Sequence, residues 1–157
     1  MSGAVAGLIG SVKAASGPTN IVNNGSATSS SDLANYYGAV RNIAIFNTTP
    51  ASWSVLYDLG SEQSAFEFLK SSSLTVGTAY SLSFWARNGF TGQTISVSLN
   101  VGNTNSIINV TPTITGWTYY KIENVTCTVS RTLDLIITAN DLFYLDDIWV
   151  IAGPTAY

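Results

Sequence analysis

The chain has 157 residues, of which 46% are hydrophobic and only 10% charged, and this length suits a single domain with its own core. Its formal net charge is −3 with only 6 Lys and Arg residues, so no basic patch can release many phosphate counterions and nucleic acid is excluded as a partner. The absence of histidine excludes Ser-His-Asp catalysis, Cys-His catalysis and His-ligated zinc.

The first segment, residues 1–17, is rich in Gly and Ala and shows no strand alternation. It lacks a basic start, and Gly7 and Gly10 interrupt its apolar stretch, so it is a poor signal peptide. It is also far too short to span a membrane, and we expect no membrane partner. We therefore predict an arm over residues 1–17, a folded domain over residues 18–157, and synthesis in the cytoplasm without secretion.

Most of the remaining sequence is typical of β-strands. Residues 80–87 and 95–101 alternate apolar and polar side chains with a period of two, and the turn-forming residues 88–92 lie between them. This arrangement predicts a hairpin. The side chains expected in its core are Tyr80, Leu82, Phe84, Ile95, Val97 and Leu99. Other strands are expected at 20–23, 40–47, 53–59, 64–69, 106–110, 117–125, 132–138 and 142–151.

Short strands separated by frequent turn signals, with no helical periodicity, indicate an all-β fold. We predict an antiparallel β-sandwich of the jelly-roll type. Its 9 Asp and Glu residues would in principle allow a glycosidase pair. None stands in a context that distinguishes it from a surface charge, so we predict that the protein is not an enzyme.

Two adjacent acids, Asp146 and Asp147, interrupt an otherwise apolar terminal strand. Burying a carboxylate is costly unless something neutralises or hydrogen-bonds it. A calcium ion could do so, because Ca²⁺ prefers hard oxygen ligands such as strand carboxylates and backbone carbonyls. In the alternative interpretation, one acid faces solvent and the other caps a bulge or accepts backbone N–H groups.

Three segments in order resemble the jelly-roll carbohydrate-binding modules of families four, nine and twenty-two. They are residues 77–87, with a Tyr-x-Leu-x-Phe strand, residues 116–120, with Trp-Thr, and residues 143–150, with the Asp-Asp pair. Residues 20–25 resemble the opening strand of that family, although residues 26–28 lack its acidic and aromatic residues. The resemblance implies a β-sandwich and a structural calcium bound by the first acid of the pair, Asp146.

Sugar binding needs aromatic rings on a polar face, because sugars stack their C–H faces on such rings while charged and amide groups bond the hydroxyls. Trp85 and Arg87 fall on the polar side of their strand, and Tyr119 and Lys121 form a similar pair on a later strand. These four residues are the predicted glycan site. In the alternative, a loop or the arm covers Trp85 and Tyr119 packs at a sheet edge.

The arm, Met1–Ala15, resembles the opening of small structural proteins of tailed bacteriophages. Its apolar residues Val5, Leu8, Ile9 and Val12 would dock on neighbouring subunits, since a lone arm cannot bury them. We therefore predict a non-catalytic virion structural or decoration protein, homo-oligomeric and bound to other virion subunits. The alternative is a stand-alone or appended carbohydrate-binding module.

Overall fold

The computed structural model describes residues 19–22, 36–37, 39–42, 47, 52–55, 57–58, 63–70 and 74–156. The predicted arm, including Val5, Leu8, Ile9 and Val12, lies outside these residues. Within them, no helix is long and apolar enough to cross a membrane. The strands are β1 (Tyr36–Tyr37), β2 (Ala39–Asn42), β3 (Ser52–Val55), β4 (Tyr57–Asp58), β5 (Gln63–Lys70), β6 (Ala79–Asn88), β7 (Ile95–Val101), β8 (Thr104–Val110), β9 (Thr118–Thr126), β10 (Leu133–Ala139) and β11 (Phe143–Ala152).

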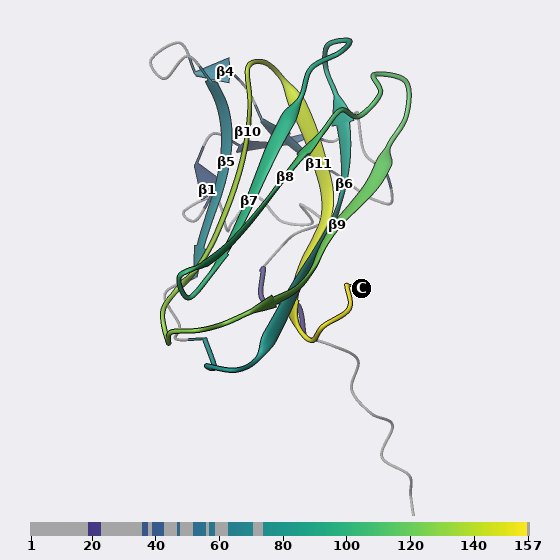
Figure 1. Ribbon diagram of the computed structural model, residues 1–157. Helices are drawn as coiled ribbons and strands as arrows, with labels where there is room; N and C mark the ends of the chain where they lie inside the picture. Colours follow the sequence, from purple (N-terminus) through teal and green to yellow (C-terminus); the bar gives the residue numbers. More distant parts are fainter. Residues whose placement is uncertain are drawn as a thin grey trace, which may run out of the picture.

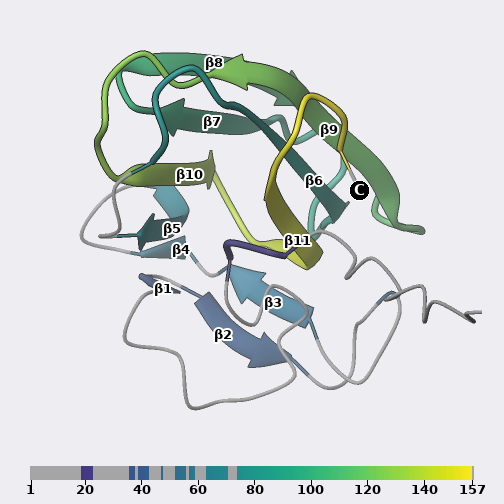
Figure 2. The same cartoon turned by 90° about the horizontal axis from the view of Figure 1, so that it is seen from below.

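The strands form two sheets that face each other (Figures 1 and 2). One sheet has the order β1-β5-β10-β7-β8, with β4 also paired to β5, and the other has the order β2-β3-β11-β6-β9. Every paired strand is antiparallel to its neighbour. The predicted all-β antiparallel sandwich is therefore confirmed.

The core lies between the sheets and is built from the apolar members of the alternating strands. All six side chains predicted inside the sandwich are buried, each with at most 4% of its surface exposed. On the β6 side, Phe84 is fully buried and its ring lies 5.7 Å from that of Tyr120, between ring centroids. Alternation therefore identifies the inward face of β6 and β7 correctly.

The predicted hairpin between residues 80–87 and 95–101 is wrong, because β6 and β7 belong to different sheets. The segment between them crosses from one sheet to the other. Asn88 stabilises this crossing, since its Nδ2 donates to the carbonyls of Gln93 and Pro112. Alternation reports which face of a strand is buried, but it does not report which strand lies beside it.

A two-residue hairpin joins β7 to β8 through Gly102 and Asn103. Both residues have positive φ, 51° and 68°, as a two-residue turn of type I′ requires. A side chain at position 102 would collide with the carbonyl oxygen of Val129, 2.0 Å from an ideal Cβ. The same turn covers Cys127, which is 1% exposed and whose Sγ donates to Val129 O.

The strand predicted at residues 20–23 is not found in its described part: residues 21–22 form a bend, and residues 20–22 lie alongside β11. The side chain of Asn20 replaces a neighbouring strand there: its Nδ2 donates to Ile148 O and its Oδ1 accepts from Val150 N. Ile21 N also donates to Val150 O, and Val22 is buried. The segment thus pairs with the edge of β11 mainly through one amide side chain.

Truncation of Phe84 should test the core directly. Phe84→Ala leaves a cavity between the sheets, and we expect it to lower the free energy of unfolding by about 3–5 kcal/mol. Ile107→Ala is the matched control, because Ile107 is 59% exposed on β8 and its loss should change the stability by less than about 0.5 kcal/mol. Urea unfolding followed by circular dichroism measures both. An unchanged midpoint for Phe84→Ala would contradict the core assignment.

Candidate functional site

The candidate site lies on the outer face, which we define as the side of β9, β6 and β11 that points away from the core. Register places Trp85 of β6 between Tyr119 of β9 and Asp146 of β11. The next outward position of β6, Arg87, lies opposite Tyr144 of β11. Aromatic and charged side chains therefore occupy adjacent positions on three neighbouring strands.

Trp85 and Tyr119 form an aromatic pair at the centre of this face. Their ring centroids are 5.5 Å apart and their planes are inclined by 62°, an edge-to-face arrangement. Tyr119 is 40% exposed and Trp85 is partly exposed. The two predicted aromatic residues therefore lie together, and the more exposed of them is Tyr119.

Arg87 is fixed by the loop that precedes β9. Its Nε donates to the carbonyl oxygen of Ile114 at 2.9 Å. That loop is itself held by reciprocal bonds between Thr113 Oγ1 and the backbone of Gly116, and by Asn88 N donating to Thr113 O. The guanidinium therefore has a defined direction beside the aromatic pair.

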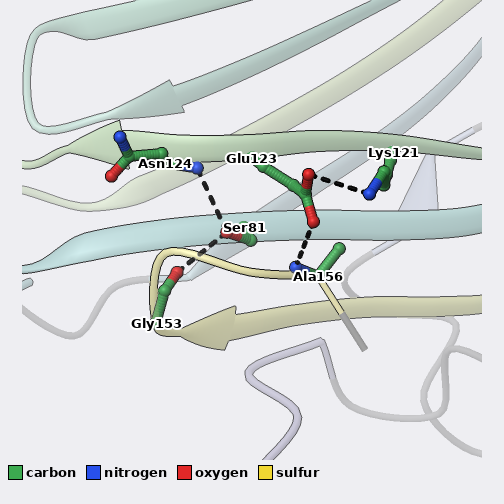
Figure 3. A network of polar contacts seen from close by, with 6 residues as sticks. All are labelled: Ser81, Lys121, Glu123, Asn124, Gly153 and Ala156. Atoms are coloured by element: carbon green, nitrogen blue, oxygen red, sulfur yellow. Dashed lines mark hydrogen bonds and ion pairs between the residues drawn. The ribbon is translucent and has the colours of Figure 1, made fainter.

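Lys121 is engaged with Glu123 two residues along β9, at 2.9 Å between Nζ and Oε2 (Figure 3). The other carboxylate oxygen of Glu123 accepts the backbone N–H of Ala156. The hydrogen bond from Lys121 and then that from Ala156 lower the pKa of Glu123, and the hydrogen bond to Glu123 raises the pKa of Lys121. The ammonium group is therefore already paired at neutral pH.

The segment after β11, residues 153–156, folds back over the outer face, and we call it the C-terminal strap (Figure 3). It turns at Gly153, whose φ of 151° strongly favours glycine. Gly153 N donates to Ala79 O, while Ser81 Oγ donates to Gly153 O and accepts from Asn124 N.

The strap explains a difference from the sequence analysis. Ser81 and Ser83 were expected on the wet side of β6, yet they are 0% and 2% exposed. The alternation is correct, but the strap covers Ser81 on the outward side. The outer face is thus closed at the Ser81 end, whereas Trp85 and Arg87 remain partly exposed toward its other end.

The acid pair occupies a bulge in β11, where the register with β6 shifts between Asp146 and Trp149. Asp146 is fully buried, and its two carboxylate oxygens accept the backbone N–H groups of Asp147 and Asn47, both at 2.8 Å. Asp147 is partly exposed and has a positive φ of 45°. This geometry matches the alternative interpretation of the pair, in which backbone amides stabilise the buried carboxylate.

The described residues hold no group of three His, Cys, Asp or Glu side chains that could enclose a metal. The donors observed at Asp146 are N–H groups, which cannot coordinate a cation. Calcium at Asp146 and Asp147 therefore stays a prediction, and it would need further oxygen ligands around the same carboxylates.

Two further aromatic residues of β11 lie on the outer face: Tyr144, which is buried, and Trp149, which was expected in the core or at its rim and is partly exposed. Tyr144 lies opposite Arg87, and Trp149 lies opposite Ser83. Strict alternation from Phe143 places Trp149 in the core, and only the bulge turns it outward. The adjacent acids in an apolar strand were the available sign of that bulge.

No protein-family model matches the sequence, and no curated protein matches it. Solved structures do match. A family 61 carbohydrate-binding module in complex with β-1,4-galactotriose has a TM-score of 0.59 and 17% identity over 86% of this chain and 99% of that one. A family 4 module has a TM-score of 0.57 and 18% identity over 83% of this chain and 99% of that one. Modules of families 16 and 22 match as well.

A tailspike protein of bacteriophage CBA120 also matches, with a TM-score of 0.63 and 13% identity. The match covers 85% of this chain but only 21% of the tailspike chain. At such identities a structural likeness shows the fold alone. The chain therefore has the jelly-roll fold found in carbohydrate-binding modules, as the sequence resemblance implied.

Calcium is tested by thermal melts. If Ca²⁺ binds only the folded protein at Asp146, millimolar Ca²⁺ should raise the melting temperature and EDTA should lower it by mass action. Asp146→Asn is the matched variant, because it removes the charge at constant size and should abolish the response to calcium. Identical melting curves of the wild-type protein with Ca²⁺ and with EDTA would contradict calcium binding at Asp146.

Proposed function

We propose that this protein is a non-catalytic carbohydrate-binding module that binds a glycan on its outer face. The observation that carries the proposal is the aromatic pair of partly exposed Trp85 and exposed Tyr119, which lies on two neighbouring strands beside Arg87. The sandwich supplies a rigid base for this pair, because the side chains between these outward positions are anchored in the core. A site on paired strands loses little conformational entropy when a ligand binds.

The chemistry of the face suits a sugar. A pyranose ring has apolar C–H faces, which stack on aromatic rings, and a rim of hydroxyl groups, which need hydrogen-bond partners. Trp85 and Tyr119 offer the aromatic surface and Arg87 offers donors beside it, while Lys121, two residues along β9, is already paired with Glu123. The inclination of 62° between the rings forms an angled seat rather than a flat platform.

The structural neighbours support the same function. The family 61 module is described with β-1,4-galactotriose bound, and a family 22 neighbour is described as a xylan-binding domain. The fold is thus one on which glycan binding occurs, and the aromatic pair of this chain provides its own local reason for it. This support favours the carbohydrate-binding module over the virion structural role.

Glycan binding should depend on the aromatic pair. We expect Trp85→Ala to abolish detectable binding on a glycan array and to weaken any ligand found there by at least about tenfold in isothermal titration calorimetry, since aromatic stacking area is lost. Tyr119→Ala should weaken the same ligand to a smaller extent.

The control is Ile107→Ala, which removes an exposed apolar side chain from the other sheet and should leave affinity unchanged. Melting temperatures of all variants establish that the sandwich remains folded. Full binding by a folded Trp85→Ala protein would exclude the outer face as the site.

The virion role and the arm remain separate predictions. If residues 1–17 mediate assembly, deleting residues 2–16 should reduce the oligomer mass measured by light scattering and leave the melting temperature of the sandwich unchanged. Replacing Val5, Leu8, Ile9 and Val12 by Ser should have the same effect at full length. An unchanged mass in both variants would contradict an assembly role for the arm.

A further inference from the structure

The polar groups of the outer face differ in whether their hydrogen-bonding capacity is already used. Lys121 is held by Glu123, and Glu123 also accepts the strap N–H of Ala156. The carboxylate of Asp146 is buried and accepts two backbone amides. These three charges therefore have partners within the protein.

Arg87 is the exception among the described charged residues of this face. Among the residues that the structure describes, its side chain forms one hydrogen bond, from Nε to Ile114 O, and no ion pair. A guanidinium carries five N–H donors, so the two terminal nitrogens keep their four N–H groups for a ligand. They form the planar fork that matches a carboxylate with two parallel hydrogen bonds.

The fork is also preorganised. Ile114 O belongs to a turn closed by Thr113 and Gly116 and tied to β6 through Asn88. A second tie joins Asn88 Nδ2 to Pro112 O at 2.8 Å. Because the side chain is anchored before any ligand arrives, binding costs less rotamer entropy than it would for a free surface arginine.

The position of the fork relative to the aromatic pair defines what it can recognise. Arg87 stands two residues after Trp85 on the same face, which corresponds to roughly 6–7 Å along the strand. A sugar stacked on Trp85 therefore places a ring substituent, or the neighbouring unit, beside the guanidinium. The opposite direction leads to the covered serine Ser81 and the strap.

We propose, on the basis of the glycan-binding function proposed above, that the preferred ligand is an acidic glycan whose uronic acid carboxylate binds the Arg87 fork. A hydroxyl group of a neutral sugar can accept one of these hydrogen bonds, but it leaves the positive charge without a counterion. A carboxylate accepts two charge-assisted bonds, each roughly twice as strong as a neutral one. The ligand thus lies with its acidic unit at the Arg87 end and away from the strap.

The test uses pairs of polysaccharides that differ only at C6 of the uronic acid, which carries a carboxylate or a neutral hydroxymethyl group: glucuronoxylan, polygalacturonate and alginate, each compared with its carboxyl-reduced form. We expect the wild-type protein to bind the acidic member of at least one pair about tenfold more tightly than the reduced member. The preference should shrink as salt is raised, because the contact is partly exposed.

Arg87→Gln should bring the two members of that pair to nearly equal affinity, because the acidic form loses two charge-assisted hydrogen bonds and the reduced form loses at most a weaker, neutral-acceptor one. Arg131→Gln is the matched control, since Arg131 is an exposed arginine in the β9–β10 loop, and it should keep the full preference. Two results would overturn the proposed preference for an acidic glycan and leave glycan binding itself intact. One is equal binding of the acidic and reduced forms by the wild-type protein, and the other is a preference that survives in Arg87→Gln.

Trp85→Ala separates this inference from the function on which it rests. It should weaken both members of the pair, because stacking does not depend on the charge. Failure of the wild-type protein to bind any acidic or neutral glycan would overturn both proposals together.

Discussion

The arrangement of the outer face depends on the hydrogen bonds of one buried carboxylate, that of Asp146. It is fully buried, and it is stabilised by the N–H of Asp147 inside its own bulge and by that of Asn47. An uncompensated carboxylate in that position would cost several kcal/mol. The bulge inserts one extra residue into β11, and this shift turns Ile148 and Val150 into the core and Trp149 out of it. Without the extra residue, the inward and outward sets of the last part of β11 would be exchanged.

The two ends of the outer face differ, because the C-terminal strap covers only the Ser81 end. At the Ser81 end, the strap forms hydrogen bonds with Ser81 of β6 and Glu123 of β9 and covers Ser81. At the Arg87 end, a short turn holds one arginine in place without using its terminal nitrogens. The aromatic pair lies between these ends, so a ligand bound there meets a closed boundary on one side and an open cation on the other. A direction along the site is thus built into the protein.

The sequence predicts which side chains of β6 and β7 face the core, but it does not predict which strands pair, because pairing depends on residues far apart in the chain. Alternation identified the inward side chains of β6 and β7 and placed Trp85 and Arg87 outward, because successive side chains of a regular strand point to opposite faces of the sheet. It could not show that β6 and β7 lie in different sheets, since strand pairing is a long-range property. The dipeptide Gly102-Asn103 was the stronger local hairpin signal, because Gly and Asn are residue types that adopt the positive φ values a two-residue turn requires. Tyr144 and Trp149 were not predicted on the outer face, because the bulge and the strands beside β11 decide their environment.

The Gly102 turn has a practical consequence through the residue beneath it. Cys127 is the sole cysteine of the chain, and it is 1% exposed beneath backbone that tolerates no added side chain at position 102. A thiol reagent can therefore reach it only when the β7–β8 turn separates from residues 127–129. The rate at which the native protein consumes such a reagent measures the opening of this end of the sandwich, without any engineered label. Conversely, a cysteine introduced at an exposed position can be labelled selectively while the native thiol stays in place.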